Sequence, residues 1–293
     1  MIAVDWGTSN FRTFQLDADG TILARRSSPQ GILRVEGGHF AETLHAEVGD
    51  WLAEGERHIL LCGMIGSREG WVEAPYLPCP VGIENLAQSV VEVPFDDAEV
   101  RLVPGVAGTD FDGVPEVMRG EETEAMGILD TCGGTGLVCF PGTHSKWIHL
   151  SDRKIVNLMT CMTGELYGAL SRNTILERTM RSGGGIDDTA FRRGIARSAD
   201  SGGLLHHLFG VRTLTLMDQL REEASASYLS GLLIGHEVRA AMPPGGAVHL
   251  VGAAPLCSLY AQTIEACGGS ATVEDEDAAA RGLAAIARRL TWS

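Results

Sequence analysis

The sequence predicts an α/β protein built from two copies of one small folding unit. Apolar runs of the β type alternate with segments whose apolar residues have helical spacing. Near the start of the chain three short strands joined by tight turns precede a helix, and the same order recurs from residue 135. A pattern that returns after roughly 130 residues indicates a duplicated domain. We expect the two halves to face one another across a cleft.

In the first copy, strands are predicted at 2–5, 11–16 and 21–27, joined by tight turns in an antiparallel meander. Apolar spacing predicts a helix over 39–53, and the apolar run 58–65 predicts a buried strand. A strand at 100–106 closes this half. The Pro-rich stretch 66–94 is expected to be irregular, and loops of that length are usually functional.

In the second copy, strands are predicted at 135–141, 146–150 and 154–161, followed by a helix from about residue 163. The segment 171–242 is mostly helical, with breaks at 182–185 and 201–203. A short strand at 249–252 leads into a helix that ends near Cys267. We therefore expect an N-terminal domain over 1–110 and a C-terminal domain over 111–293, with the helical insertion 171–242 in the second.

Two patterns in the second half have structural explanations. The acidic run 274–277 precedes Leu283, Ile286 and Leu290 at helical spacing, and carboxylates at a helix N-terminus complement its dipole. We therefore predict a helix start there and no metal site. Gly231 and Gly235 lie four residues apart in a helical segment, which predicts close packing of helices.

Composition limits the class of protein. Of the 293 residues 44% are apolar and 21% charged, as in globular proteins. No apolar run has the length of a membrane span, and the chain begins with a strand, so we expect a cytoplasmic protein. The seven scattered cysteines are expected to be reduced. A net charge of −15 argues against nucleic acid and acidic membranes as partners, but not against a phosphorylated ligand.

The first turn of the chain has the residues of a phosphate site. Asp5 ends the first strand, where a carboxylate can hold Mg²⁺, and Gly7 permits a close approach of the backbone. Thr8, Ser9 and Asn10 add neutral donors. An ordinary β-hairpin turn has the same composition, so these residues alone leave both interpretations open.

Three further segments carry chemistry. Arg119-Gly120 interrupts a helical run and places Glu121 at a helix start, where it can accept a proton from a hydroxyl; the alternative is solvated helix charge. The turn at 142–146 occupies the place in the second half that the first turn has in the first. There Gly142 and Thr143 can hold phosphate, and His144 or Lys146 can neutralise charge.

The third segment is the turn Gly252-Ala253, which has only small residues and suits a flat nucleoside. Simple packing of a strand against a helix is the alternative there. Taken together, the segments resemble the 2-dehydro-3-deoxygalactonokinase family, within the superfamily of sugar kinases, heat-shock ATPases and actin. The resemblance spans nearly the whole chain and rests on VDWGTSNFR (4–12), CGMIGSREGWVEAPYLPCP (62–80), VPGVAG (103–108), VMRGEETEAMG (117–127), FPGTHSKWIHL (140–150), TGELYGAL (163–170) and LVGAAPLCSLYAQTIEACG (250–268).

The resemblance implies two ribonuclease-H-like domains that clasp ATP and Mg²⁺, and transfer of the γ-phosphoryl group to the C6 hydroxyl of 2-dehydro-3-deoxy-D-galactonate in galactonate breakdown. It implies that Asp5 and Thr8 serve a first phosphate motif, 143–146 a second, and Gly252 with Ala253 the adenosine motif. Glu121 aligns with the first Glu of the Gly-Glu-Glu motif of the related exopolyphosphatases, which implies the general base. Pro141 stands where many relatives have Asp, which leaves Asp5 as the expected metal carboxylate.

A 2-keto acid needs a cation for its carboxylate, and the expected cleft loops offer Arg12, Arg68 and Arg119. Arg68 is our first choice, because it follows the fourth strand in the loop that also carries Ser67 and Trp71. We expect closure of the domains over both ligands to exclude water.

Two other classes remain open at this point: a phosphohydrolase of the exopolyphosphatase type, and an ATP-binding relative of actin that forms filaments. The segment 62–80 weighs against both, since it resembles the sugar-acid kinases specifically. A homodimer is one possible assembly.

Overall fold

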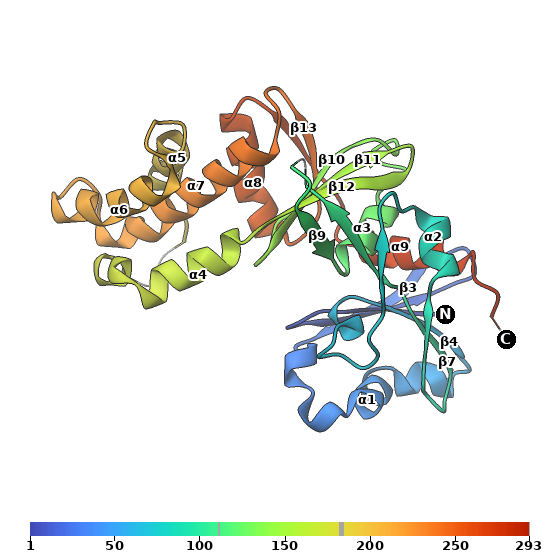
Figure 1. The fold of residues 1–293 in the computed structure, drawn as a ribbon. Coiled ribbons are helices and arrows are strands. Elements are labelled where there is room, and N and C mark those ends of the chain that lie inside the picture. Colours follow the sequence, from blue (N-terminus) through green and yellow to red (C-terminus); the bar gives the residue numbers. More distant parts are fainter. Residues whose placement is uncertain (111, 182–184, 293) are drawn as a thin grey trace. The chain divides into compact units, whose positions relative to one another are not determined.

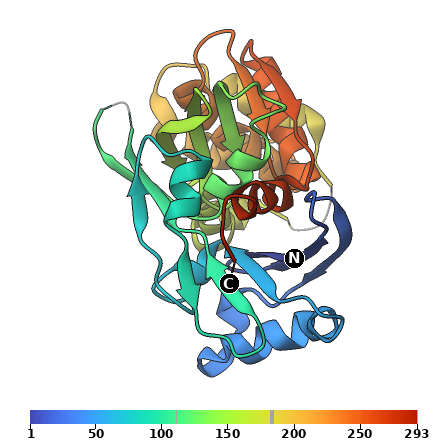
Figure 2. The ribbon, with the colours of Figure 1, turned by 90° about the vertical axis from the view of Figure 1, so that its right-hand side faces the viewer.

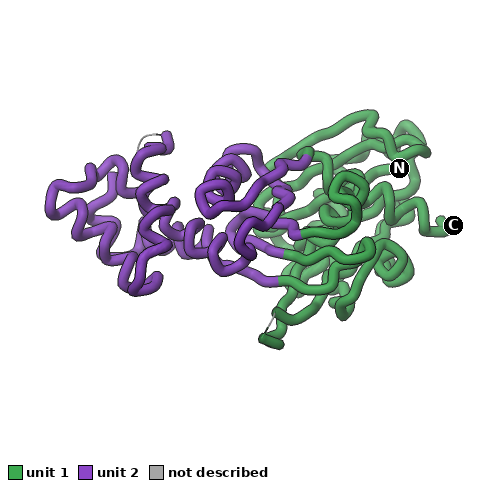
Figure 3. The backbone as a smooth tube through the Cα atoms, turned by 90° about the horizontal axis from the view of Figure 1, so that it is seen from above, with its two compact units in different colours: residues 1–136, 148–158, 275–293 green, residues 137–147, 159–274 purple. Residues whose placement is uncertain are grey.

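The computed structural model describes residues 1–110, 112–181 and 185–292 (Figure 1). The described chain forms two compact units (Figure 3): unit 1 comprises 1–136, 148–158 and 275–293, and unit 2 comprises 137–147 and 159–274. The predicted domain boundary between residues 110 and 111 stays a prediction. The predicted helix break at 182–185 falls largely on residues 182–184, outside the described residues.

Unit 1 is organised around a six-stranded sheet of order β3-β2-β1-β4-β7-β6. The predicted antiparallel meander is confirmed, since β1 pairs with β2 and β2 with β3. Strand β4 runs parallel to β1, and β7 runs parallel to β4. The strands are β1 (Ile2–Trp6), β2 (Phe11–Leu16), β3 (Ile22–Ser28), β4 (His58–Cys62), β6 (Val91–Val93) and β7 (Glu99–Leu102).

Helices cover both faces of this sheet (Figure 2). The predicted helix α1 (Phe40–Ala53) packs on one face, where Val4 and Trp6 share a core with Leu44. Side chains alternate along a strand, so Asp5 belongs to the opposite face. There the helix α9 (Ala278–Ala287) packs against β1 and β4.

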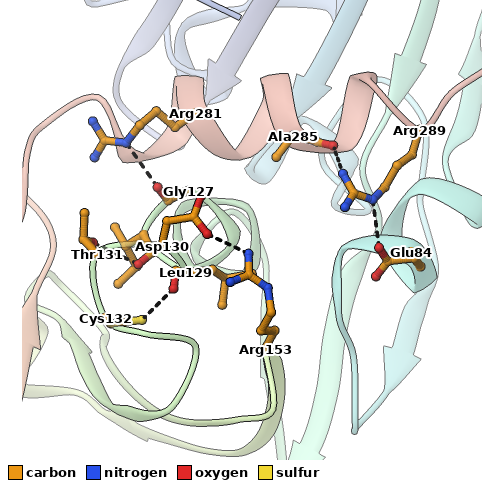
Figure 4. Close-up of polar contacts among 11 residues, drawn as sticks. Glu84, Gly127, Leu129, Asp130, Thr131, Cys132, Arg153, Arg281, Ala285 and Arg289 are labelled. Carbon is orange, nitrogen blue, oxygen red and sulfur yellow. Dashed lines mark hydrogen bonds and ion pairs between the residues drawn. The ribbon is translucent and has the colours of Figure 1, made fainter.

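Helix α9 fixes the position of α3 (Glu121–Gly127) within unit 1. A Cβ on Gly282 would lie 1.9 Å from the carbonyl oxygen of Thr123, so the two helices cross with their backbones in contact. Arg281 Nε donates to the carbonyl of Gly127 at 3.1 Å (Figure 4). At the other end of α9, Arg289 Nε donates to Glu84 Oε1 of α2 (Ile83–Gln88) at 2.9 Å. The C-terminal helix thus holds α3 and α2 together.

Three predictions for unit 1 need correction. The expected strand 100–106 divides at 103–104 into β7 and β8 (Gly105–Thr109), because Pro104 has no amide hydrogen to continue a ladder. Strand β8 instead joins a separate sheet of order β5-β8-β9 with β5 (Tyr76–Pro78) and β9 (Pro115–Met118). The stretch 66–94 is not irregular throughout, since it contains β5, α2 and β6. The predicted strand 58–65 is shorter than expected: β4 ends at Cys62, because Gly63 turns the chain with φ 94°.

The sheet of unit 2 has the order β12-β11-β10-β13-β14. Its strands are β10 (Gly136–Phe140), β11 (Ser145–Ser151), β12 (Lys154–Cys161), β13 (Ala247–Leu250) and β14 (Ser270–Val273). The end of β11, from Ile148, and the beginning of β12, up to Leu158, belong to unit 1. The three strands predicted between 135 and 161 are confirmed, whereas β14 was not foreseen. Strands β10, β13 and β14 run parallel.

The α-helices in the described part of unit 2 are α4 (Thr163–Asn173), α5 (Asp188–Arg197), α6 (Gly203–Leu216), α7 (Glu222–Ala241) and α8 (Ala254–Ala266). The predicted close packing at two glycines is confirmed. A Cβ on Gly231 would lie 2.0 Å from the carbonyl oxygen of Phe191, and one on Gly235 would lie 2.4 Å from Ser198 Oγ. Within the described ranges, every helix is too short or too polar to cross a bilayer.

Candidate active site

Asp5, Arg12 and Glu124 form a charged cluster in unit 1. Asp5 faces Arg12 across the β1–β2 ladder. Arg12 Nε donates to Asp5 Oδ2 at 2.8 Å, and Nη2 donates to the same oxygen and to Glu124 Oε1 at 3.2 Å. The charge of Asp5 raises the pKa of Arg12, whereas burial and then Asp5 raise the pKa of Glu124 to about 7. The cluster therefore concentrates negative charge around one arginine.

Two glycines bring the turn before Glu121 next to Asp5. Gly63 has φ 94°, and a Cβ there would lie 2.7 Å from the carbonyl oxygen of Trp6 and 3.1 Å from Asp5 Oδ1. Gly120 has φ 110°, and its Cβ would lie 3.3 Å from Gly63 Cα. These φ values favour glycine, so the loop after β4 and the start of α3 can approach closely.

The carboxylates of α3 have different surroundings. Glu121 begins the helix as predicted, and its Oε2 accepts a hydrogen bond from the Arg119 amide at 3.2 Å. Glu122 is fully buried and accepts from the Gly120 amide at 2.7 Å and from Thr123 Oγ1 at 3.0 Å. Burial and then the charge of Glu121 raise the pKa of Glu122 to about 8. Solvated helix charge is therefore the wrong interpretation for Glu122.

The predicted substrate residues of the loop after β4 differ in exposure. The Arg68 side chain is 84% exposed and pairs with Glu73 at 3.1 Å. Ser67 is buried, and its hydroxyl has no hydrogen-bond partner among the described residues. Trp71 packs against Phe40 and Phe95, at ring distances of 6.5 and 6.1 Å. An exposed ion pair contributes little to stability, so Arg68 can exchange Glu73 for another carboxylate.

Arg119 lies beside this loop with its guanidinium buried. Nη2 donates to the carbonyl of Ala74 at 2.7 Å, and the guanidinium carbon stands 4.4 Å from the ring centre of Tyr76. Nε and Nη1 have no hydrogen-bond partner in the part of the chain that the structure describes. Buried donors without partners are costly, and such groups call for an explanation such as a water or a ligand.

The first turn exposes its hydroxyl side chains and closes on its own backbone. Thr8, Ser9 and Asn10 are exposed. The Gly7 amide donates to the carbonyl of Asn10 at 2.9 Å, so that amide is occupied within the turn. Gly31 packs against the other side of the turn, where a Cβ would lie 2.4 Å from the carbonyl oxygen of Thr8.

In unit 2 the two predicted nucleotide segments meet at one edge of the sheet. Strands β10 and β13 are parallel with Cys139 opposite Leu250, so Pro141 and Gly252 both follow at the carboxyl ends. Gly252 has φ 145°, and a Cβ there would lie 3.6 Å from the carbonyl oxygen of Pro141. Ala253 immediately precedes α8. The carboxyl edge of parallel strands is the usual ligand site of α/β sheets.

The start of α4 packs against the turn at 142–144. A Cβ on Gly164 would lie 2.5 Å from the carbonyl oxygen of Gly142, and the Glu165 amide donates to the carbonyl of Thr143 at 3.0 Å. His144 pairs with the Glu165 carboxylate. The turn is therefore fixed to a helix N-terminus.

Lys146 lies one residue inside β11 and is buried. Its Nζ donates to Thr160 Oγ1 at 3.1 Å.

Three residues in or next to the site escaped sequence reasoning: Glu124, Glu165 and Glu237, the last of which accepts hydrogen bonds from Ser145 and Trp147 of β11. Glu124 lies three residues after Glu121 and so on the same helix face, a spacing that could have indicated it. Glu237 interrupts an apolar helical run, and a charge at a buried position usually has a partner. Glu165 has no comparable signal.

Comparisons with known proteins bear on the whole chain. A model of the 2-keto-3-deoxy-galactonokinase family matches residues 5–286. A probable 2-dehydro-3-deoxygalactonokinase from Rhizobium meliloti (strain 1021) is 36% identical over 297 residues, covering 99% of this chain and 97% of that protein. A 2-dehydro-3-deoxygalactonokinase from Escherichia coli (strain K12) is 32% identical over 290 residues, covering 98% and 97%.

Solved structures show the same fold. A crystal structure assigned to a 2-dehydro-3-deoxygalactonokinase protein from Sinorhizobium meliloti has a TM-score of 0.89 at 36% identity and covers 98% of each chain. The (R)-2-hydroxyglutaryl-CoA dehydratase component A from Acidaminococcus fermentans has a TM-score of 0.53 at 12% identity, covering 99% of this chain and 98% of that one. The predicted α/β fold class with two ribonuclease-H-like domains is confirmed.

Proposed function

The chain belongs to the 2-keto-3-deoxy-galactonokinase family, and we propose that it transfers the γ-phosphoryl group of ATP to the C6 hydroxyl of 2-dehydro-3-deoxy-D-galactonate. This reaction is a step of galactonate breakdown, and we expect it in the cytoplasm. In the reaction the C6 oxygen bonds to the γ-phosphorus, the bond from that phosphorus to the β–γ bridging oxygen breaks, and ADP leaves. The hydroxyl proton passes to a base.

One observation carries the nucleotide half of this proposal. The turn at 142–144, the turn at Gly252-Ala253 and the N-terminus of α4 share the carboxyl edge of one sheet. Backbone amides and the dipole at a helix N-terminus favour phosphate, and small residues admit a flat base. We assign Gly142, Thr143 and His144 to phosphate, and Gly252 with Ala253 to the nucleoside.

Asp5 fits the role of magnesium ligand. Arg12 takes its Oδ2, whereas the described partner of Oδ1 is the weak thiol donor of Cys62 at 4.0 Å. Mg²⁺ is commonly held by one or two carboxylates together with substrate phosphates. When bound, the ion neutralises charge on the phosphate oxygens. We assign the exposed groups of Thr8, Ser9 and Asn10 to the same phosphates, with Gly7 permitting a close approach through its lack of a side chain.

For the acceptor, Glu121 is proposed as the general base. It begins α3 beside the Gly63–Gly120 contact, which places the start of this helix next to Asp5. Lys146 is proposed to balance charge that moves to the leaving ADP.

The substrate carboxylate is proposed to bind Arg68, in a loop with Ser67 and Trp71. The unpartnered hydroxyl of Ser67 and the unpartnered nitrogens of Arg119 support a polar ligand near this loop. Arg12, which we also predicted to bind the substrate, already pairs with the carboxylates of Asp5 and Glu124. Among the three arginines it is therefore the one that lies beside the proposed magnesium ligand.

A panel of keto-deoxy sugar acids tests this function. The protein is incubated with ATP, Mg²⁺ and each acid, and ADP release is followed. The proposal predicts release that depends on 2-dehydro-3-deoxy-D-galactonate. Release without an acceptor would indicate the phosphohydrolase, which none of the comparisons supports, and assembly detected by light scattering without turnover would indicate a filament protein.

A further inference from the structure

A buried carboxylate lies behind the proposed phosphate turn in unit 2. Glu237 belongs to α7 and is 5% exposed, between the apolar residues Ile234 and Val238. Burial raises its pKa, whereas hydrogen bonds from four side chains oppose that shift. Burying a carboxylate costs free energy unless hydrogen-bond donors satisfy its oxygens. The stability of this group therefore depends on the positions of its donors.

The donors are well defined. Trp147 Nε1 donates to Glu237 Oε1 at 2.7 Å, and the Tyr260 hydroxyl donates to Oε2 at 2.7 Å. Ser145 Oγ is 3.4 Å from Oε2 and 2.8 Å from the Tyr260 hydroxyl. The Thr163 side chain also hydrogen-bonds the carboxylate. An indole N–H can only donate, so Oε1 has to be an acceptor.

These donors come from the segments that form the proposed nucleotide site. Ser145 begins β11 directly after the turn at 142–144, and Thr163 begins α4, which packs against that turn. Tyr260 lies on α8, the helix that follows Gly252 and Ala253. Helix α8 contacts both α7 and β13, and Figure 1 shows it between them.

We propose that Glu237 is a positioning residue for the nucleotide: its carboxylate ties the phosphate turn, the start of α4 and the nucleoside helix α8 into one arrangement. This inference rests on the proposed function, because it presupposes that ATP binds at these segments. Glu237 has no place in the proposed reaction. Its effect is to hold backbone amides in the geometry that phosphates require, so that ATP meets a preorganised site.

The variant E237Q tests this role with little change in size. A carboxamide has one acceptor oxygen, so its NH₂ group faces either the Trp147 N–H or the Tyr260 and Ser145 hydroxyls. The hydroxyls can rotate to accept a hydrogen bond from this NH₂ group, but the hydrogen bonds that join α7 to β11 and α8 become weaker. We expect the dissociation constant and KM for ATP to rise about tenfold. KM for the sugar acid should change less than twofold.

A second variant, Y260F, keeps the carboxylate and removes one donor, and we expect about a threefold rise in the dissociation constant for ATP. E223Q is the matched control, since Glu223 is exposed in the first turn of the same helix. It should leave every constant unchanged.

Calorimetric titration of the full-length variants with ATP and Mg²⁺, alongside initial rates and circular dichroism, separates the outcomes. A selective loss of ATP affinity in folded E237Q or Y260F supports the inference. Wild-type ATP affinity in both folded variants overturns it, as does an equal rise in both KM values. If E237Q does not fold, Y260F decides alone. A wild-type protein that fails to bind ATP would overturn the proposed function as well, which the other outcomes leave intact.

Discussion

The burial of Glu122 predicts that the variant E122Q changes how stability depends on pH. In the folded protein the pKa of this carboxyl is raised from 4.5 to about 8, chiefly by burial. The folded state therefore binds the proton more tightly than the unfolded state. The stabilisation that results is fully present below pH 4.5 and is lost as pH rises through about 8.

The magnitude follows from the shift. One pKa unit corresponds to about 1.36 kcal/mol, so the wild type should lose about 2.5 kcal/mol of unfolding free energy through this group between pH 5 and 7, and about 4 kcal/mol by pH 9. Gln mimics the protonated carboxyl and does not titrate. Its amide can still accept from the Gly120 amide and donate to Thr123 Oγ1. The stability of E122Q relative to wild type should therefore increase with pH by those amounts.

Urea unfolding followed by tryptophan fluorescence at pH 5, 7 and 9 measures this difference. Glu124 titrates in both proteins, so its contribution largely cancels. The exposed Glu54 provides the control variant E54Q, whose difference from wild type should be the same at each pH. Parallel stability curves for E122Q and wild type would refute the inference that burial raises the pKa of Glu122.

Three further predictions concern activity and packing. D5N should lower kcat by about a hundredfold or more with an unchanged circular dichroism spectrum, because the magnesium carboxylate is lost while the neighbouring packing survives; near-normal turnover would contradict the role of Asp5. R68A should raise KM for the keto acid by about tenfold, as expected for a lost hydrogen bond to a charged group, while E73Q, which only frees Arg68, should not raise it; an unchanged KM in R68A would exclude Arg68 from the carboxylate site. G231A should lower the unfolding free energy by about 3 kcal/mol, because its Cβ would meet the Phe191 carbonyl at 2.0 Å, whereas G210A, with nothing within 4 Å of its Cβ, should stabilise α6 by about 0.5–1 kcal/mol; equal urea midpoints would contradict this contrast.

Local patterns predicted most of the fold. The meander at the start of the chain and the strand Lys154–Cys161 follow from alternation and turn residues, which act over a few positions. The errors arise where the pairing of strands that are distant in the sequence determines whether a segment forms a strand and which sheet it joins. Strand β14 gains its partner, β13, only in the folded sheet, and the split at Pro104 sends β8 to a different sheet. Neither partner choice is visible in a short window.

Some turns near the proposed site could be predicted from the sequence, because a turn that needs a positive φ favours glycine. Gly120 and Gly252 both have positive φ values, which residues with a side chain rarely adopt. Both lie next to proposed site residues. The partners of charged residues were not predictable. Arg12 meets Glu124 from 112 positions away along the chain, and Glu237 meets Trp147 from 90, so only the folded structure reveals these pairs.

The most direct test of the account is the position of the phosphate in the product. The protein is incubated with ATP, Mg²⁺ and 2-dehydro-3-deoxy-D-galactonate, and the product is examined by phosphorus–proton correlation NMR. We predict one phosphate ester whose phosphorus couples to the protons on C6, formed in equal amount with ADP. Inorganic phosphate in place of the ester, or coupling to the proton of another carbon, would contradict the proposed transfer.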